Sequence, residues 1–187
     1  MIARFEDRIL KSPLPLPPRV DPDAIKDFDY RRVYTTGLLR HDQEMLIGPR
    51  IHDGKDGYLV VTPLEREGSG STILVNRGWI AKKFRRQFDR KDGLPKGAVT
   101  VEGLLREPWQ KNMFTPDNKP ELGEFYFPDV EQMAKFTGSD PIWIEETMRK
   151  SRTNHPTNGM GADYAIRTGP SESIRQRSCW HSYRSAC

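Results

Sequence analysis

Residues 71–79 read STILVNRGW, and this stretch decides the fold that we expect. Its apolar part has the composition of a strand, and the strand ends in a polar residue, a cation, a glycine and a large aromatic. Gly78 permits a bulge or a turn of positive φ, and Trp79 is expected to fill the core beyond that point. Asn76 and Gly78 are therefore interpreted as structural residues.

The chain on either side of this stretch contains further short strands. Residues 58–64 (YLVVTPL) and 71–79 flank a Glu/Gly/Ser turn, which predicts a hairpin. Pro63 within the strand pattern indicates an edge or a bulge. Strand composition also occurs at residues 30–39, 44–49, 99–107, 124–127 and 141–145.

One helix is well marked. Asp129 followed by Gln132 has the pattern of an N-terminal cap, and Gly138 suits the left-handed residue that ends a helix. Many short strands, few helices and frequent turns favour a mainly β (α+β) domain, a small curled sheet or barrel-like fold with one helix near residues 129–137. The inner face of this helix is expected to hold Val130, Met133, Ala134 and Phe136.

The two ends of the chain differ from this body. Residues 2–10 have the spacing of a short amphipathic helix. Residues 12–18 (SPLPLPP) are expected to form an extended connector, with a ligand for an SH3-like domain as the less favoured alternative. Residues 149–187 contain no Leu, Val or Phe, so they offer little to bury and are expected to be disordered. The predicted β-rich domain therefore spans residues 1–148.

The charge is unevenly distributed. The net charge of the chain is +4, but residues 149–187 carry seven basic residues against two acidic ones. The first 148 residues are left with a net charge of −1, which argues against nucleic acid as a partner of the body. The loop 82–91 (KKFRRQFDRK) nevertheless has the basic and aromatic residues with which small barrels bind nucleic acid. A nucleic-acid-binding barrel therefore stays as an alternative. No apolar run approaches the roughly 18–20 residues that span a bilayer, and no signal peptide is recognisable.

The sequence contains no recognisable set of catalytic residues. The glycine-containing segments lack phosphate-loop spacing, and there is no Gly-x-Ser-x-Gly motif. His41 and His52 stand in loops beside aspartates, where histidines are more often solvated than catalytic. Cys179 and Cys187 have no partners at zinc-ligand spacing. We therefore expect no enzyme, no metal site and no resident cofactor.

Arginines near strand ends are the candidates for binding. Arg77 can bind a carboxylate or a propionate through two hydrogen bonds. The sequence pattern of residues 76–79 alone nevertheless favours a structural role for it. Exposed arginines and aromatic residues frequently carry recognition at protein interfaces. The candidate partner-binding residues are Arg77, Trp79, Arg50, Arg31 and Tyr126.

Several motifs, taken in chain order, resemble the surfeit locus protein 1 family of cytochrome c oxidase assembly factors. The most specific is VNRGW (75–79), with VTPL (61–64) before it and the PDN-P segment of residues 114–138 after it. The resemblance covers residues 1–148, and its proline-rich beginning is similar to fungal members. It implies a mitochondrial inner-membrane protein with a helix at each end and a β-rich domain in the intermembrane space. It also implies non-catalytic binding of oxidase subunits or other factors while the largest subunit matures, around haem a insertion.

The sequence departs from the family's pattern at both ends. The two membrane helices are not found in it, and after residues 141–146 (PIWIEE) a different tail replaces the family's Arg-Asn…His strand. We interpret this tail as an alternative splice or a shifted reading frame after about Met148. The missing histidine is the natural axial ligand of haem iron, so a haem a-binding chaperone is a less favoured alternative to an assembly factor without cofactor.

Overall fold

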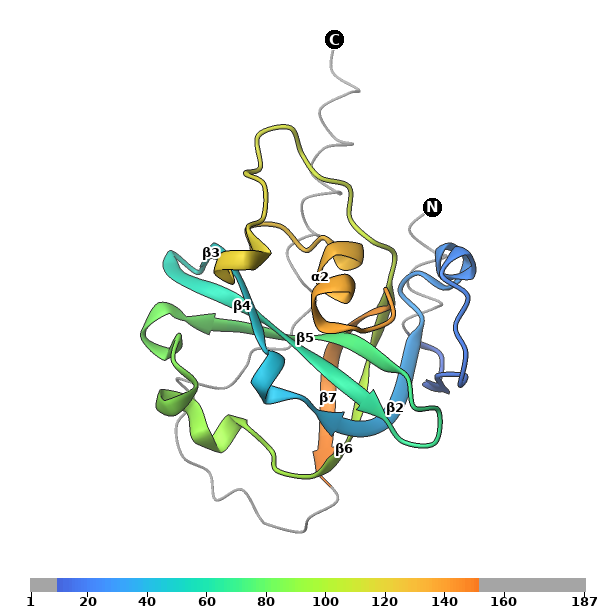
Figure 1. Cartoon of the computed structure of the whole chain (residues 1–187). Coiled ribbons are helices and arrows are strands. Elements are labelled where there is room, and N and C mark those ends of the chain that lie inside the picture. Colours follow the sequence, from blue (N-terminus) through green and yellow to red (C-terminus); the bar gives the residue numbers. More distant parts are fainter. Residues whose placement is uncertain (1–9, 152–187) are drawn as a thin grey trace.

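The computed structural model describes residues 10–151 of the chain (Figure 1). Its strands are β1 Leu14–Pro15, β2 Arg32–Leu39, β3 Met45–His52, β4 Lys55–Arg66, β5 Thr72–Ala81, β6 Ala98–Arg106 and β7 Trp143–Ser151. The α-helix among these residues is α2 Val130–Thr137, and the 3₁₀ helices are η1 Asp23–Phe28, η2 His41–Gln43, η3 Lys82–Phe84, η4 Gln87–Gly93 and η5 Pro120–Leu122. Within this part of the chain no helix has the length and apolar character needed to cross a membrane. The helix expected at residues 2–10 and the tail beyond residue 151 lie outside the described residues.

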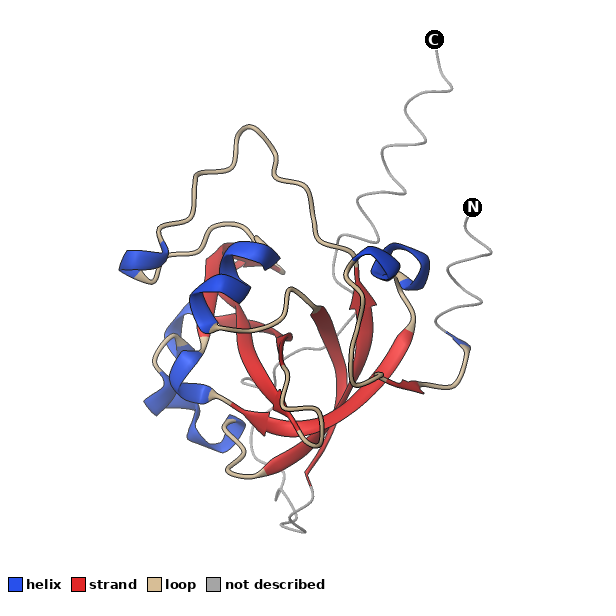
Figure 2. Cartoon of the chain, turned by 45° about the vertical axis from the view of Figure 1, so that its right-hand side comes forward, coloured by secondary structure: helices blue, strands red, loops and turns tan. Residues whose placement is uncertain are grey.

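The strands form one sheet that closes on itself. Their order is β1-β2-β6-β7-β5-β4-β3, and closure results because β2 also pairs with β4 (Figure 2). The strands β2, β6, β7, β5 and β4 therefore make a small barrel, and β1 and β3 extend the sheet beside it. The pairs β5–β7 and β1–β2 are parallel, and the others are antiparallel. The expected mainly β, barrel-like fold is confirmed.

β5 carries an uninterrupted apolar run because both of its faces are covered. Ile73 and Val75 belong to the core cluster that fills the barrel. Leu74 faces the other way and packs with Met133 of α2 in a second cluster outside the barrel wall. A strand that is buried on both faces does not show the alternation of a half-exposed strand. The expected hairpin of β4 and β5 is confirmed by their antiparallel register.

The bulge expected at Gly78 is present, and it changes the side on which the following side chains lie. The pairing with β4 shows one extra residue in β5 between Asn76 and Trp79, and Gly78 has a φ of 100°. Asn76 Oδ1 accepts a hydrogen bond from the Gly78 N–H at 3.0 Å. The extra residue reverses the alternation, so Ile80 is buried and Trp79 lies half-buried on the outer surface. The expectation that Trp79 fills the core is therefore wrong.

α2 begins and ends as predicted. Asp129 Oδ1 accepts a hydrogen bond from the backbone N–H of Gln132 at 2.9 Å, and Gly138 ends the helix with a φ of 68°. Phe136, however, is 51% exposed. Thr137 takes the inward position in its place, because it lies one turn beyond the buried residues of the preceding turn.

Two segment boundaries also differ from expectation. Residues 124–127 do not form a strand, since Phe125 pairs with Ile47 through a single isolated bridge. The backbone of Phe125 thus contacts β3 at one point, and its side chain packs in the cluster beneath α2. β7 continues to Ser151, three residues beyond the domain end expected at residue 148.

The proline-rich connector is extended, as expected, and it is attached to the barrel. β1 pairs in parallel with β2, and Leu16 is buried. The buried guanidinium of Arg66 donates hydrogen bonds to the carbonyl oxygens of Leu16 (2.7 Å), Pro17 (2.8 Å) and Pro18 (3.1 Å). Removal from water lowers the pKa of this guanidinium, although the negative charge of Asp140 opposes the shift. The connector is therefore part of the folded body. Proline has no backbone N–H to donate, but its carbonyl group can accept a hydrogen bond, and these carbonyl groups hold the connector in place.

Closure of the barrel requires glycine at position 37. Gly37 pairs with Val99 of β6 and with Arg66 of β4, so two strands approach β2 at the same point. A Cβ atom at this position would lie 2.1 Å from the carbonyl oxygen of Glu65. A backbone carbonyl cannot rotate away as a side chain can, and the absence of a Cβ is what lets β4 reach β2.

We expect Gly37→Ala to lower the free energy of unfolding by at least about 2 kcal/mol, because the added methyl group forces the two strands apart. Gly97→Ala is the matched control, since a Cβ there has no neighbour within 4 Å. It should change stability by less than about 0.5 kcal/mol. Urea denaturation followed by circular dichroism measures both variants, and equal midpoints would contradict this account of closure.

Candidate functional site

Arg77, the cation of the VNRGW motif, lies inside the protein. Its side chain is fully buried, its Nη2 donates a hydrogen bond to the carbonyl of Gly93, and its Nη1 lies 3.5 Å from a carboxylate oxygen of Glu44. The expectation that Arg77 is exposed is therefore wrong. The reason is the alternation of β5, which places residue 77 on the same side as Ile73 and Val75.

A second buried arginine shares the same carboxylate. Arg90 Nη1 donates to Glu44 Oε2 at 2.9 Å, Nη2 donates to Glu44 Oε1, and Nε donates to the carbonyl of Phe84 at 3.0 Å. The side chains of Arg90 and Glu44 are each 3% exposed. We call Glu44, Arg77 and Arg90 the Glu44 network. It places two guanidinium groups on one carboxylate and fastens η3 and η4 to the barrel.

A comparable network joins the segment before β2 to the end of β6 and the start of β7. Arg106 Nη1 donates to Glu145 Oε2 at 2.9 Å, and its Nε lies 3.2 Å from Asp29 Oδ1. Its Nη2 donates to the hydroxyl of Tyr30 at 2.9 Å, and the guanidinium lies 4.0 Å from the centre of the same ring. Sequence reasoning did not identify Asp29, Arg106 and Glu145 as members of a network, because they are far apart in the chain.

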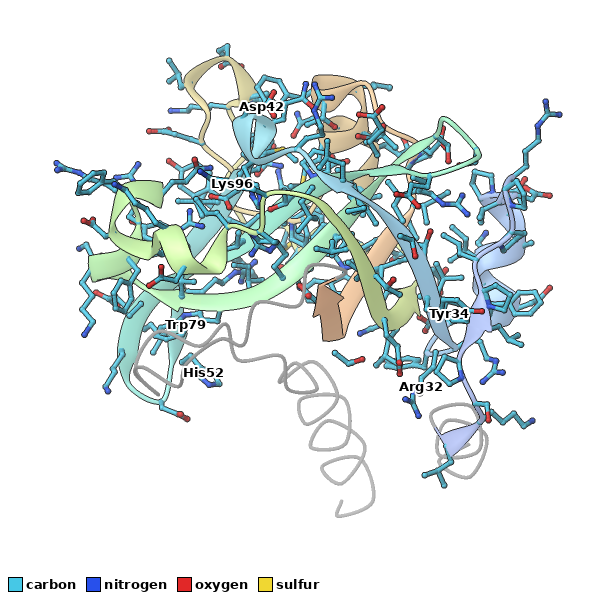
Figure 3. All side chains as sticks on the ribbon, turned by 90° about the horizontal axis from the view of Figure 1, so that it is seen from below. Arg32, Tyr34, Asp42, His52, Trp79 and Lys96 are labelled. Atoms are coloured by element: carbon cyan, nitrogen blue, oxygen red, sulfur yellow. The ribbon has the colours of Figure 1, made fainter. Side chains whose placement is uncertain are left out.

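Three of the predicted partner-binding residues lie together. The indole N–H of Trp79 donates to the carbonyl of Arg50 at 3.2 Å, and Arg50 Nη2 donates to the carbonyl of Tyr126 at 3.2 Å. The ring of His52 lies 5.3 Å from that of Trp79, and Figure 3 shows the two side by side. We call Arg50, His52, Trp79 and Tyr126 the Trp79 surface.

The polar groups of this surface are constrained by their surroundings. Arg50 Nε is buried and has no hydrogen-bond partner among residues 10–151, and burial lowers the pKa of its guanidinium. The hydroxyl of Tyr126 donates to Glu124 at 3.0 Å, and this bond raises the pKa of the phenol. Arg31 is not part of the Trp79 surface. It lies just before β2 and donates to the carbonyl of Ser12 at 2.8 Å. The next residue, Arg32, lies on the opposite side of the molecule from Trp79 in Figure 3.

The two described histidines, His41 and His52, have different surroundings. His41 Nε2 lies 3.0 Å from the carbonyl oxygen of Pro95, and its Nδ1 is buried. His52 packs on Trp79 and lies 3.5 Å from Asp53. Residues 10–151 also contain no group of three or more His, Cys, Asp or Glu side chains that could hold a metal ion.

The loop between β6 and α2 projects from the barrel, at the top of Figure 1. At its tip the backbone N–H of Thr115 donates to the carbonyl of Asn112 at 3.0 Å, which makes Met113 and Phe114 the central residues of a β-turn. Their side chains are 87% and 86% exposed. We call residues 112–115 the apolar turn. Sequence reasoning missed it, because these turn positions ordinarily carry small or polar residues.

The base of this loop is firmly held. The Asn118 side-chain oxygen accepts the backbone N–H groups of Tyr126 (2.7 Å) and Phe127 (3.0 Å). Its amide nitrogen donates to the carbonyl of Phe127 and to the side chain of Gln132, each at 2.9 Å. An ion pair between Lys111 and Asp117 closes the loop nearer its tip and lowers the pKa of the Asp117 carboxyl. The apolar turn is therefore presented on an anchored support.

These features define a class: a small closed β-barrel whose buried charges fasten its own segments and which displays an apolar turn on a projecting loop. The SURF1 family matches residues 1–179, a range that extends past residue 148, where the resemblance was expected to end. The chain belongs to the SURF1 family.

The relatives cover most of this chain. Surfeit locus protein 1 of Mus musculus is 35% identical over an alignment of 173 residues, and the match covers 85% of this chain and 56% of the mouse protein. The Homo sapiens protein of the same name is 33% identical over 174 residues, 85% of this chain and 57% of the human one. Cytochrome oxidase assembly protein SHY1 of Saccharomyces cerevisiae is 33% identical over 150 residues, 78% of this chain and 39% of the yeast protein. The chain thus spans little more than half the length of the mammalian relatives.

Glu44→Gln should destabilise the protein by about 3–5 kcal/mol, because two buried guanidinium groups lose their counter-charge. Glu65→Gln is the control, since Glu65 pairs with Arg40 on the surface, where the two side chains are 48% and 42% exposed. Its cost should stay below about 1 kcal/mol. Urea denaturation gives both values, and trypsin cleavage within residues 82–96 should accelerate only in Glu44→Gln. The same cleavage rate in both variants would show that the network does not hold this segment.

Proposed function

We propose that this chain is a non-catalytic assembly factor for mitochondrial cytochrome c oxidase. Membership of the SURF1 family and the relationship to a yeast protein named as a cytochrome oxidase assembly protein support this role. The chain would bind oxidase subunits or other assembly factors during maturation of the largest subunit. We place it at the mitochondrial inner membrane with the barrel facing the intermembrane space, and we propose no cofactor and no nucleic-acid partner for it.

The way in which the barrel uses its charges supports a role without catalysis. Glu44 is enclosed by two guanidinium groups, and Glu145 is bonded to Arg106, so these buried carboxylates serve the fold. The described histidines stand apart, one in the η2 turn and one on the Trp79 surface. A general base has to lie within hydrogen-bond reach of the group that it activates. No such pairing with a nucleophile occurs among the contacts described above.

The apolar turn is the observation that carries the docking part of the proposal. Met and aromatic residues are enriched in the cores of protein interfaces, and large side chains that stand free in water acquire their stabilising contacts when a partner covers them. The charged residues around the turn have an acidic excess, which suits a partner with an apolar pocket and a basic rim. These residues are Glu107, Asp117, Glu121 and Glu124 on the acidic side, and Lys111 and Lys119 on the basic side.

The Trp79 surface is a second contact area within the same proposal. Arg50, Trp79 and Tyr126 are each partly exposed, and they combine aromatic rings with a guanidinium as interface residues commonly do. Contact of Arg31 with a partner also stays a prediction, and Arg31 is not part of the Trp79 surface.

We expect the double variant Met113→Ser, Phe114→Ser to weaken capture of newly made oxidase subunits at least about tenfold while leaving the free energy of unfolding within about 0.5 kcal/mol, because these side chains make few internal contacts. Capture is measured by co-isolation of labelled subunits with the full chain, added to detergent extracts of mitochondria from yeast that lack SHY1. Stability is measured by urea denaturation.

Ile51→Ser is the comparison variant, because Ile51 is 69% exposed and lies next to Arg50 of the Trp79 surface. It should weaken capture much less than the double variant, because the apolar turn carries the main docking contact. Loss of capture in Ile51→Ser alone would move the docking site to the Trp79 surface. Failure of the unmodified chain to capture any oxidase subunit or assembly factor would contradict the proposed function itself.

A further inference from the structure

A dense group of cations lies on one short surface segment. Residues 82–96 pass through η3 and η4 on the outside of the barrel, at the lower left of Figure 1. We call residues 82–96 the basic segment. Its exposed acidic side chains are Asp89 and Asp92. Its exposed basic side chains are Lys82, Lys83, Arg85, Arg86, Lys91 and Lys96.

These cations are available to a partner. None of the six forms an ion pair with another residue of the described range 10–151. Some other surface cations do have carboxylate partners, as in the pairs Arg32–Glu102 and Arg40–Glu65. The charge of the basic segment is therefore directed outward, and it contrasts with a body whose first 148 residues have a net charge of −1.

The basic segment is a fixed platform. Arg90, within it, is held by Glu44, and the side-chain amide of Gln87 donates to the carbonyl of His41 at 2.6 Å. The Glu44 network beneath it contains two guanidinium groups for one carboxylate, so the interior adds to the positive potential at this surface. A partner that binds here does not have to order the segment first.

An exposed aromatic ring stands among the cations. Phe88 is 72% exposed, and Lys91 Nζ lies 3.7 Å from the centre of its ring. Lys83 lies 4.8 Å from the ring centre of Phe84 in the same way. An apolar ring with an ammonium group beside it matches the boundary of a lipid bilayer, where the ring enters the headgroup layer and the cation meets the phosphates.

We propose that the basic segment docks the barrel on the surface of an anionic lipid bilayer. Clusters of this size and sign are attracted to negatively charged headgroups, and each cation near the surface contributes. Nucleic acid is the other polyanion that such a cluster attracts. Its binding to a single strand requires free ring faces on which bases stack, whereas one face of Phe88 is already covered by Lys91. This inference rests on the surface charge and does not depend on the oxidase partner.

The first test compares the full chain on vesicles of phosphatidylcholine alone and of phosphatidylcholine mixed with phosphatidylglycerol, by co-sedimentation. We expect binding to the anionic vesicles alone, with release at high salt. The variant Lys82→Gln, Lys83→Gln, Arg85→Gln, Arg86→Gln should bind these vesicles at least about tenfold more weakly. A single-stranded oligonucleotide bound more tightly than the anionic vesicles, and lost in this variant, would overturn the proposal in favour of nucleic acid.

The control variant removes the same amount of charge elsewhere, through four Gln substitutions at the exposed cations Arg19, Lys26, Lys119 and Lys135. It should retain binding. This comparison matters because residues 149–187 also carry a net charge of +5. Equal binding by both variants, whether both keep it or both lose it, would assign attraction to the tail or to net charge and would overturn the proposal.

The second test locates the contact. Phe88→Trp should show a blue shift of its added fluorescence, relative to the unmodified chain, when anionic vesicles are present, because the ring leaves water. Phe114→Trp is the matched variant on the apolar turn, at another end of the molecule in Figures 1 and 2. It should not shift. A shift in Phe114→Trp but not in Phe88→Trp would contradict docking through the basic segment.

Discussion

The carboxylate of Glu44, shared by two buried guanidinium groups, is the interaction on which much of the structure depends. It reaches Arg77 at the inner face of β5 and Arg90 in η4, and so connects the barrel wall to the segment that contains η3 and η4. Charged groups are costly to remove from water unless they are paired and hydrogen-bonded. The buried contacts of Glu44 fix the positions of η3 and η4. They therefore also determine the shape of the surface that these two helices form.

Buried arginines recur in this protein in different chemical settings. Arg66 bonds to neutral backbone carbonyls of the connector, Arg106 to carboxylates and a phenol, and Arg77 and Arg90 to one glutamate. The planar guanidinium group offers several donors at fixed angles, which suits it to joining segments that are distant in sequence. A small barrel has a narrow apolar core. These long side chains add buried contacts outside that core, with the connector, the basic segment and the start of β2.

Features that depend on local sequence patterns were predicted correctly. Predictions of side-chain burial were wrong where the outcome depends on residues that are distant in the sequence. The cap of α2 at Asp129 and the bulge at Gly78 are local, and both were anticipated. Arg77 was expected on the surface because nothing near it in the chain identifies Glu44 as its partner. Trp79 was expected in the core, but a single inserted residue reverses the alternation beyond it and places its side chain on the outer surface. The apolar turn gave no signal, since the exposure of Phe114 depends on how far the loop stands from the barrel.

Attachment of the connector has a consequence for how the molecule can be handled. Because β1 runs parallel to β2 and Arg66 holds the three carbonyls that follow, the backbone reaches the barrel at one place and in one direction. A rigid tag or spin label introduced at Leu14 would consequently report the orientation of the barrel axis, instead of averaging over a flexible tether. Such a label offers a fixed reference point for distance measurements within larger assemblies.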